Sequence, residues 1–400
     1  MKLDNTHKTV YLDYAATTPI DSEVLQNMLP YFDAIYSNPS SLHTSGRRAG
    51  QAIAQARSEM AHILNASPDE IIFTGSGTES DNLAICGTTR ANRDSGNHII
   101  VSSIEHKAIL ESVRQLEKEG YRVSIVPVDT YGTIDVATCL NLITPDTILI
   151  SVMYANNEIG TIQPIKELSD AIKKYRDETS SHFPLLHTDA CQAAGFLSLD
   201  VQDLGVDLMT LNGSKIYGPK GIGMLYKKKE VKIEPIIFGG EQEHNLRAGT
   251  ESVPLIVGFA KALKKVNDNR MTESKRLIKL RDYFIDRLQE KIPTLIRNGH
   301  SEKRLPNNIH ISIPHVEGES ISLMLDQYGI EVSTGSACSA YDLKPSHVLS
   351  AIGQNPDVIH GSIRFSLGKY TTRKELDYVL LIFPGIITRL TSISAITTNK

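Results

Sequence analysis

The chain has 400 residues, with an apolar share of 40%, a charged share of 22% and a formal net charge of -4 at pH 7. This charge balance argues against a surface built for nucleic acid or an anionic membrane. The N-terminal stretch MKLDNTHKTVYLDYAATTP has no apolar core of signal-peptide length, and YVLLIF near the C-terminus is too short to span a bilayer, so we expect a cytoplasmic protein.

The middle of the chain alternates strand-like runs with helix-like segments. Short runs rich in β-branched residues and bounded by turn residues predict strands. These runs occupy 70–77, 97–103, 122–128, 147–154, 184–190, 207–213 and 221–226. Charged amphipathic segments between them, such as 111–120 and 164–175, predict helices. This alternation favours an α/β fold with a mostly parallel sheet covered on both faces.

The pattern changes after Pro254. Two long amphipathic segments, 254–268 and 272–292, predict two helices. Strands are expected near 307–314, 330–334 and 362–367. This mixture indicates a second, smaller α+β domain.

Four cysteines occur, Cys86, Cys139, Cys191 and Cys338, at gaps of 53, 52 and 147 residues. No CxxC pair or zinc spacing exists, so no metal site is predicted. The first three lie in apolar or ligand-side stretches, where a cysteine packs as a small buried residue. Cys338 lies in STGSACSAYDLKPS, which is small and polar on both sides and predicts an exposed thiol on a loop.

Polar clusters follow several predicted strands, and ligands of open parallel sheets bind beyond the carboxyl ends of strands. In FTGSGTESDN, Gly75 and Gly77 allow a ligand to approach the backbone closely. Thr78 is expected to cap the next helix, with Asp81 three residues on. A helix N-terminus of this kind suits a phosphate. The dinucleotide fingerprint fails, because Ser80 occupies the position of its third glycine.

Three more clusters place His106 in SSIEHKAI, Asn156 and Asn157 in YANNEIG, and Asp189 in HTDACQ. Taken singly, a lone histidine is more often structural, and an acid after a strand is often a helix cap. For each motif taken alone, both a structural and a functional role remain open.

The last cluster is the turn NGSKIYGPKG at 212–221. It is compatible with a phosphate-binding loop, the seat of a covalent cofactor or a surface turn. Gly213 and Gly218 fit a nucleoside-triphosphatase loop, but Pro219 occupies its lysine position and no Ser or Thr follows Lys220. Together, a phosphate site, an acid, an imidazole, an amide and a lysine match what pyridoxal phosphate requires.

The motifs also carry a family resemblance that covers nearly the whole chain. They are YLDYAATTP, FTGSGTESDNLAI, EHKAIL, NNEIGTIQPI, HTDACQAAG, GSKIYGPKGIGMLY, GGEQEHNLRAGT, VEGESI, STGSACSA and SIRFSLGKYTT. In this order they resemble the cysteine desulfurases of the nitrogen-fixation and iron–sulfur cluster type, which are fold-type I, class V aminotransferase-like pyridoxal phosphate enzymes. The resemblance implies a large cofactor-binding domain over 14–260. Residues 1–13 and 261–400 would form a small α+β domain that carries the catalytic cysteine loop.

The resemblance also implies how the cofactor is held. Lys215 would bind it covalently, whereas Lys220 would shape the glycine turn. His106 would stack on the pyridine ring and transfer protons, and Asp189 would pair with the ring nitrogen. The other implied cofactor contacts are Gly77, Thr78, Asn157, Gln192, Asn212, Ser214 and, from the neighbouring subunit, Thr250. A homodimer is therefore expected.

Substrate and partners follow from the same resemblance. Asn38 and Arg364 would hold the carboxylate of L-cysteine, a task that suits a planar guanidinium. Cys338 would take the sulfur as a persulfide, or transiently bind a cluster, while L-alanine leaves. A sulfur-acceptor or cluster scaffold protein would receive the sulfur. The alternatives are a selenocysteine lyase, a class V aminotransferase and a non-catalytic partner protein.

One departure from the family pattern concerns the residues before the lysine. The family usually has Ser-x-His there, and this chain has Asn212 and Ser214. Both side chains donate hydrogen bonds, but neither supplies an imidazolium. The resemblance therefore says least about cofactor affinity and its pH dependence.

Overall fold

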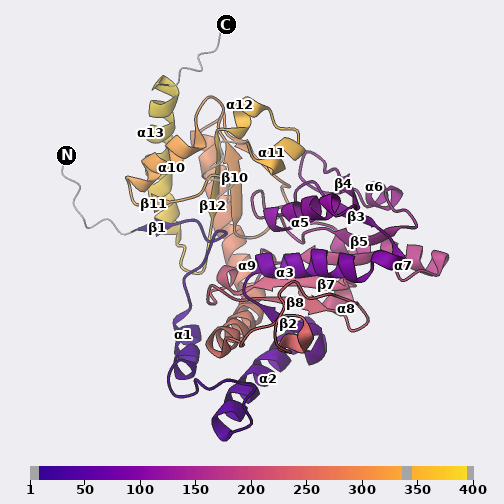
Figure 1. The fold of residues 1–400 in the computed structure, drawn as a ribbon. Helices are drawn as coiled ribbons and strands as arrows, with labels where there is room; N and C mark the ends of the chain where they lie inside the picture. The colour runs from indigo at the N-terminus through magenta and orange to yellow at the C-terminus, as the bar shows by residue number, and fades with distance from the viewer. Residues whose placement is uncertain (1–8, 336–344, 394–400) are drawn as a thin grey trace.

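The protein is described by a computed structural model over residues 9–335 and 345–393. Its main sheet has seven strands in the order β2-β8-β7-β6-β5-β3-β4 (Figure 1). The strands are β2 (Ile71–Thr74), β3 (His98–Ser102), β4 (Arg122–Val126), β5 (Thr147–Ser151), β6 (Leu185–Asp189), β7 (Leu208–Asn212) and β8 (Gly223–Lys227). Strand β8 is antiparallel to both its neighbours, β2 and β7, and the other pairs in the sheet are parallel. The seven predicted strands and the mostly parallel sheet are confirmed.

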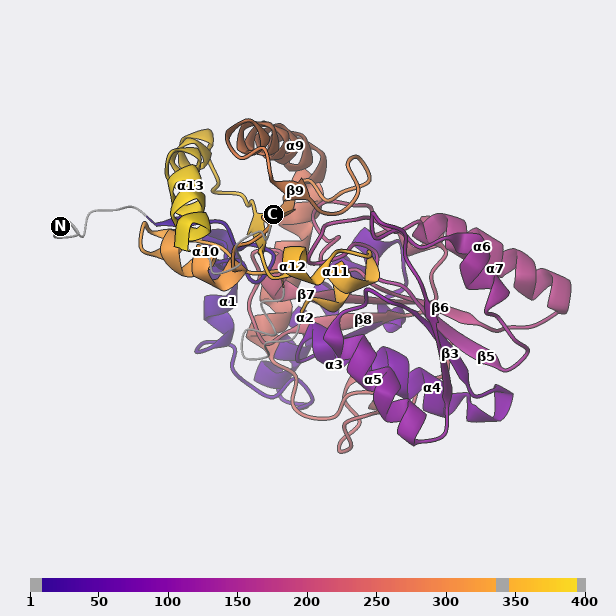
Figure 2. The ribbon, with the colours of Figure 1, turned by 90° about the horizontal axis from the view of Figure 1, so that it is seen from above.

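Helices cover both faces of this sheet. Those of the first half of the chain are α1 (Ser22–Met28), α2 (Thr44–Leu64), α3 (Gly77–Asn82), α4 (Thr88–Ala91), α5 (Lys107–Lys118), α6 (Val136–Asn141), α7 (Ile165–Thr179) and α8 (Val201–Leu204). Figure 2 shows α3, α4 and α5 on one side of the strands, and α6 and α7 on the other. Side chains alternate accordingly along β3: Ile100 packs in the core of α2 and α7, whereas Ile99 and Val101 pack in the core of α5.

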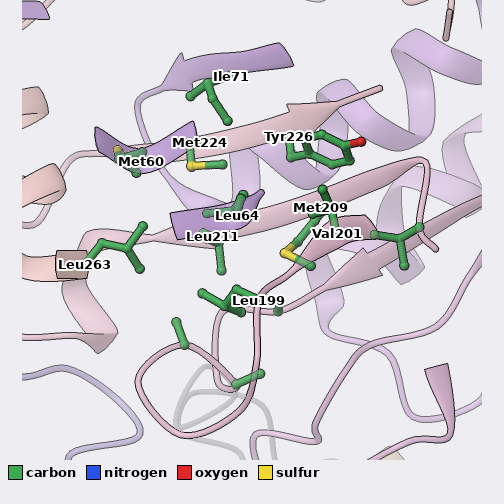
Figure 3. Close-up of a cluster of buried hydrophobic side chains, with 14 of the residues drawn as sticks. Met60, Leu64, Ile71, Leu199, Val201, Met209, Leu211, Met224, Tyr226 and Leu263 are labelled. Carbon is green, nitrogen blue, oxygen red and sulfur yellow. The ribbon is translucent and has the colours of Figure 1, made fainter. Parts of the chain in front are cut away.

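The larger core lies where α2 crosses the sheet. Met60 and Leu64 of α2 pack in one cluster with Ile71, Leu211 and Met224 of the strands, and these side chains are fully buried (Figure 3). Close packing on this face fixes the ends of β2, β7 and β8 relative to each other. Those ends carry the polar loops of the site.

A single helix, α9 (Val253–Lys291), replaces the two helices predicted for this part of the chain. The predicted break at 269–271 contains neither glycine nor proline, so nothing interrupts the hydrogen-bond ladder. The first part of α9, up to Leu263, packs in the larger core, and the part from Leu277 to Leu288 packs in a second core. The domain boundary predicted at 260 lies within this helix and stays a prediction.

The second core belongs to a smaller α+β region. Its sheet has the order β12-β10-β9, and β1 pairs with β11 beside it (Figure 1). The elements are β1 (Val10–Tyr11), β9 (Ile296–Arg297), β10 (Asn308–Ser312), α10 (Gly318–Asp326), β11 (Ile330–Glu331), α11 (His347–Ala351), α12 (Pro356–Ile359), β12 (Ser362–Ser366) and α13 (Arg373–Ile393). Phe365 meets Phe284 and Phe383 edge to face, with ring centroids 5.3 and 5.7 Å apart.

Among the residues described, α13 is the one helix that is long and apolar enough to cross a membrane by length and composition. The sequence argument considered only YVLLIF, and the helix continues beyond both ends of that stretch. Leu376, Phe383 and Leu390 on α13 are buried in the second core. In this structure one apolar face of α13 packs in the second core, whereas Leu381 and Ile393 on the same helix are exposed.

Candidate active site

A cavity of about 420 Å³ lies at the carboxyl ends of β3, β5, β6 and β7. It brings together nine of the predicted site residues: Gly77, Thr78, His106, Asn157, Asp189, Gln192, Asn212, Lys215 and Arg364. These residues are spread over almost 290 positions of the sequence, from residue 77 to residue 364. Eight of them lie at or after the carboxyl ends of strands of the main sheet, which explains how these eight meet, whereas Arg364 comes from β12 of the smaller region.

Lys215 is the lysine of the 212–221 turn that reaches the cavity, whereas Lys220 is exposed and lies outside it. Lys215 ends a short 3₁₀ turn after β7, and its Nζ donates to the carbonyl oxygen of Ala16. The N-terminal segment holds this turn: Thr18 N–H donates to the Ser214 carbonyl at 2.8 Å, and Thr18 Oγ1 accepts from Tyr217 N–H at 2.7 Å. The lysine is therefore presented by two segments that are far apart in sequence.

The loop before α3 differs from the cap predicted for it. Ser76, not Thr78, is the N-cap, and its Oγ accepts from Glu79 N–H at 3.1 Å. Glu79 reaches back and accepts from Gly75 N–H at 2.8 Å. Because these two side chains complete the cap, Thr78 faces the cavity, and Asp81 lies buried beneath it.

Gly77 leaves room that any other residue would fill. A Cβ atom there would lie 3.1 Å from both Asn212 Nδ2 and Cys191 Sγ. The N-terminus of α3, an amide donor and an unfilled backbone position thus face one another across the loop. This donor set fits a phosphate group.

The substituted pair before the lysine is internally hydrogen-bonded. Ser214 Oγ donates to Asn212 Oδ1 at 2.9 Å, which leaves the Asn212 amide group towards Gly77. Asn212 lines the cavity, but Ser214 is not among the lining residues. The chain therefore retains one neutral donor at this place.

Asp189 and His106 each combine a cavity position with a local structural role. Asp189, at the end of β6, accepts from Cys191 N–H at 2.9 Å, and Gln192 beside it donates to the Ala15 carbonyl at 3.0 Å. His106 is the N-cap of α5, and its Nδ1 accepts from Ala108 N–H at 3.2 Å. In a neutral imidazole this leaves the proton on Nε2. The structural role that a lone histidine often has is thus present for His106, whereas Asp189 accepts within a turn and does not cap a helix.

Arg364 enters the cavity from β12 and is only 2% exposed. Its Nη1 donates to the Asn157 carbonyl at 2.8 Å, and its Nη2 donates to Asp13 Oδ1 at 2.9 Å. Its buried Nε has no hydrogen-bond partner among the described residues. Two of the five N–H donors of the guanidinium thus orient it, and the second N–H of each Nη is left for an anionic ligand.

Besides Ser214, two of the predicted residues that the structure describes, Asn38 and Thr250, do not line this cavity. Asn38 is exposed, and its Oδ1 accepts from Ser40 N–H at 2.9 Å. Thr250 is exposed as well, and Asn38 and Thr250 are both absent from the lining. Cys338 lies outside the described residues.

Sequence reasoning missed buried acids around the cavity. Burial raises the pKa of Glu105 to about 8 and that of Glu158 to about 7. Glu105 accepts from Met153 N–H at 2.8 Å, and Glu158 accepts from Ser346 Oγ at 2.6 Å. An acid next to a predicted site residue, as in IEHK and NNEIG, was the available signal. Asp81 is a third buried acid at this cavity, and it lies three residues after Thr78.

This arrangement is that of enzymes that carry pyridoxal phosphate on a lysine. The chain belongs to the aminotransferase class-V family, whose model matches residues 10–379. It is 49% identical to the cysteine desulfurase IscS of Dictyoglomus turgidum, over 97% of this chain and 96% of that protein. Members of this family depend on pyridoxal phosphate, and the donor set around Lys215 fits that group.

Solved structures agree. A NifS-like protein superposes with a TM-score of 0.89 at 36% identity, covering 96% of this chain and 100% of that one. SspA in complex with cysteine superposes with a TM-score of 0.80 at 34% identity, covering 91% of this chain and 100% of that one. The likeness therefore extends over both the main sheet and the smaller region.

Proposed function

We propose that the protein is a pyridoxal-phosphate-dependent cysteine desulfurase, which converts L-cysteine to L-alanine and leaves the sulfur as a persulfide on Cys338. The observation that carries the proposal is the meeting of Lys215, Asp189 and Arg364 in one cavity of a chain that is 49% identical to a cysteine desulfurase. A lysine, an acid and a guanidinium there supply the three contacts that an amino-acid substrate and this cofactor need.

Each residue has a distinct task. Lys215 would hold the cofactor, and its amine would serve as the base that takes the proton from the substrate Cα. Asp189 keeps the ring nitrogen protonated. The bound cofactor supplies an electron sink for the pair left at Cα. Arg364 would orient the substrate carboxylate through guanidinium N–H groups that the contacts to Asn157 and Asp13 leave unused. His106 covers the ring and moves protons through Nε2.

The sulfur step requires a thiolate, which we assign to Cys338. Its thiolate attacks the substrate sulfur, so that an S–S bond forms as the substrate C–S bond breaks. The electron pair of the C–S bond remains with carbon, and protonation then gives alanine. The other three cysteines are buried, and burial raises the pKa of each of their thiols. They are poor candidates for this role.

The protein would act as a cytoplasmic homodimer and pass its sulfur to an acceptor or scaffold protein, for iron–sulfur cluster assembly or thiolation. Thr250 is exposed in this chain, as a residue would be that completes the phosphate site of a neighbouring subunit. Asn38 is exposed too. We propose that dimer formation covers both.

The decisive experiment incubates the purified protein with L-cysteine and a reductant and measures alanine and sulfide together. Equal amounts of both products are expected. Cys338→Ser should retain the cofactor and bind L-cysteine, seen as a change in the cofactor absorbance, but release almost no alanine. Parental turnover by that variant would exclude the persulfide route and favour lyase chemistry.

A further inference from the structure

A glutamate closes the loop at residues 75–78, which we call the phosphate loop. Glu79 is the third residue of α3, and its Oε2 accepts from Gly75 N–H at 2.8 Å. It directly follows Thr78, which lines the cavity. A carboxylate in the first turn of a helix and a phosphate at its N-terminus are attracted to the same positive helix end, and they repel each other. The charge of Glu79 therefore opposes phosphate binding unless another group compensates it.

Arg247 supplies the opposite charge. Its Nε donates to Glu79 Oε1 at 2.9 Å, and the two side chains are 26% and 17% exposed. A Cβ atom on Gly75 would lie 2.7 Å from Glu79 Oε2 and 3.4 Å from Arg247 Nη2, so the ion pair covers the space that a side chain there would need. Glu79 and Arg247 are not among the described residues that line the cavity. Arg247 would thus act on the phosphate loop through Glu79 and not by contact with a ligand.

A strained turn leads into Arg247. Glu243, His244 and Asn245 have φ values of 47°, 58° and 64°, so three successive residues other than glycine adopt the left-handed conformation. Side chains make this conformation costly, and it persists only where the surrounding structure holds it. The turn closes through Leu246 N–H, which donates to the Glu243 carbonyl at 3.0 Å. The position of Arg247 is therefore set by a turn that has few alternative conformations.

The side chain of Glu243 anchors this turn to the main sheet. It is 2% exposed and accepts two hydrogen bonds from Arg57, at 2.9 and 2.6 Å. It also accepts from Phe73 N–H at 2.8 Å. Phe73 belongs to the edge strand β2, whose end leads into the phosphate loop. The segments that carry Arg247 and Glu79 are thus tied to the same strand, which keeps the two charges together.

We propose that Arg247 is a positioning residue that holds and neutralises Glu79, so that Glu79 closes the phosphate loop without repelling the cofactor phosphate. This inference rests on the assignment of Gly77 and Thr78 to the phosphate site. A partly exposed ion pair contributes little to stability by itself. Its effect here is on the binding of an anion, because the anchored turn fixes the pair beside the phosphate loop.

The first test compares two ligands that differ by the phosphate group. The full-length protein is freed of cofactor and titrated with pyridoxal phosphate or with pyridoxal, and binding is followed by absorbance. Arg247→Met should raise the Kd for pyridoxal phosphate roughly 2- to 5-fold, the size of a charge effect at a helix N-terminus, and leave the Kd for pyridoxal unchanged. An unchanged Kd for pyridoxal phosphate, or an equal rise for both ligands, would overturn the proposal.

The second test uses the sign of the charge. Glu79→Gln keeps an oxygen that accepts from Gly75 N–H but removes the negative charge. This variant should bind pyridoxal phosphate at least as tightly as the parent. The double variant Arg247→Met/Glu79→Gln has the net charge of the parent and should return to the parental Kd. A double variant that binds as weakly as Arg247→Met, or weaker binding by Glu79→Gln alone, would show a purely structural ion pair and refute the proposal.

The matched control is Arg90→Met, because Arg90 also forms a partly exposed ion pair with a glutamate, Glu119, but lies outside the cavity. Its Kd for pyridoxal phosphate should equal that of the parent, and a rise as large as that of Arg247→Met would contradict the proposal. Glu79→Gln carries the test alone if Arg247→Met does not fold. None of these measurements needs turnover of L-cysteine, so failure here is distinguishable from failure of the proposed function.

Discussion

Replacing Arg364 with lysine keeps the positive charge but removes the planar set of N–H donors that a guanidinium provides. In the parent, Nη1 donates to the Asn157 carbonyl at 2.8 Å and Nη2 donates to Asp13 at 2.9 Å, which leaves the second N–H of each Nη and the Nε–H unused by these contacts. The single Nζ of lysine cannot keep both structural contacts and still reach a carboxylate. At least one charge-assisted hydrogen bond to the substrate is lost, which is worth about 1.5–3 kcal/mol.

This loss corresponds to a rise of roughly 10- to 100-fold in the KM for L-cysteine. The carboxylate is bound equally before and during reaction, so kcat should change much less than KM. Initial rates of alanine formation over a range of L-cysteine concentrations measure both constants. The matched control is Arg276→Lys, because Arg276 likewise donates to backbone carbonyls, those of Gly368 and Thr371, and to a carboxylate, that of Glu273, but lies outside the cavity. An unchanged KM in Arg364→Lys, or an equal rise in the control, would refute the reasoning.

Three further outcomes are expected. Borohydride should fix the cofactor to the peptide of Lys215, as detected by mass spectrometry, and a label on Lys220 would contradict the assignment. Glu158→Gln should raise the Tm more at pH 8 than at pH 5, because a pKa raised to about 7 makes the parent lose stability as pH rises from about 4.3 towards 7; a constant difference between the two pH values would contradict this. Ser214→His should slow the loss of cofactor during dialysis, measured by absorbance, by adding a donor that the pair before Lys215 lacks; unchanged retention would mean that the existing pair is already sufficient.

The strands of the main sheet were predictable from local pattern, and one helix was not. Each predicted strand is a short apolar run ended by turn residues, and these signals act within a few positions. The break in α9 was predicted at the point where the apolar residues move from one face of the helix to another. A change of phase marks a different packing partner and does not end a helix, since Asn269, Arg270 and Met271 tolerate helical geometry.

The candidate site was predictable as far as it follows from strand ends. Lys215, Asp189 and His106 each follow a strand, so the parallel sheet alone brings them to one edge. Asp81 and Glu158 were not predicted as site residues, because their burial depends on elements far away in sequence. The local sequence identifies a carboxyl group, but it does not show how far the fold removes that group from solvent, and this burial shifts its pKa.

Helix α9 determines whether the two regions of the protein can exist as separate fragments. Its 39 residues make a rod of about 58 Å that is shared by both hydrophobic cores. A cut at residue 260 would leave Ile256 and Phe259 on a helix stub and strip the smaller region of the turns that lead into Leu277. Neither fragment would keep its core covered, so we expect the two regions to unfold in one cooperative transition, and a gene split at that point to yield insoluble halves.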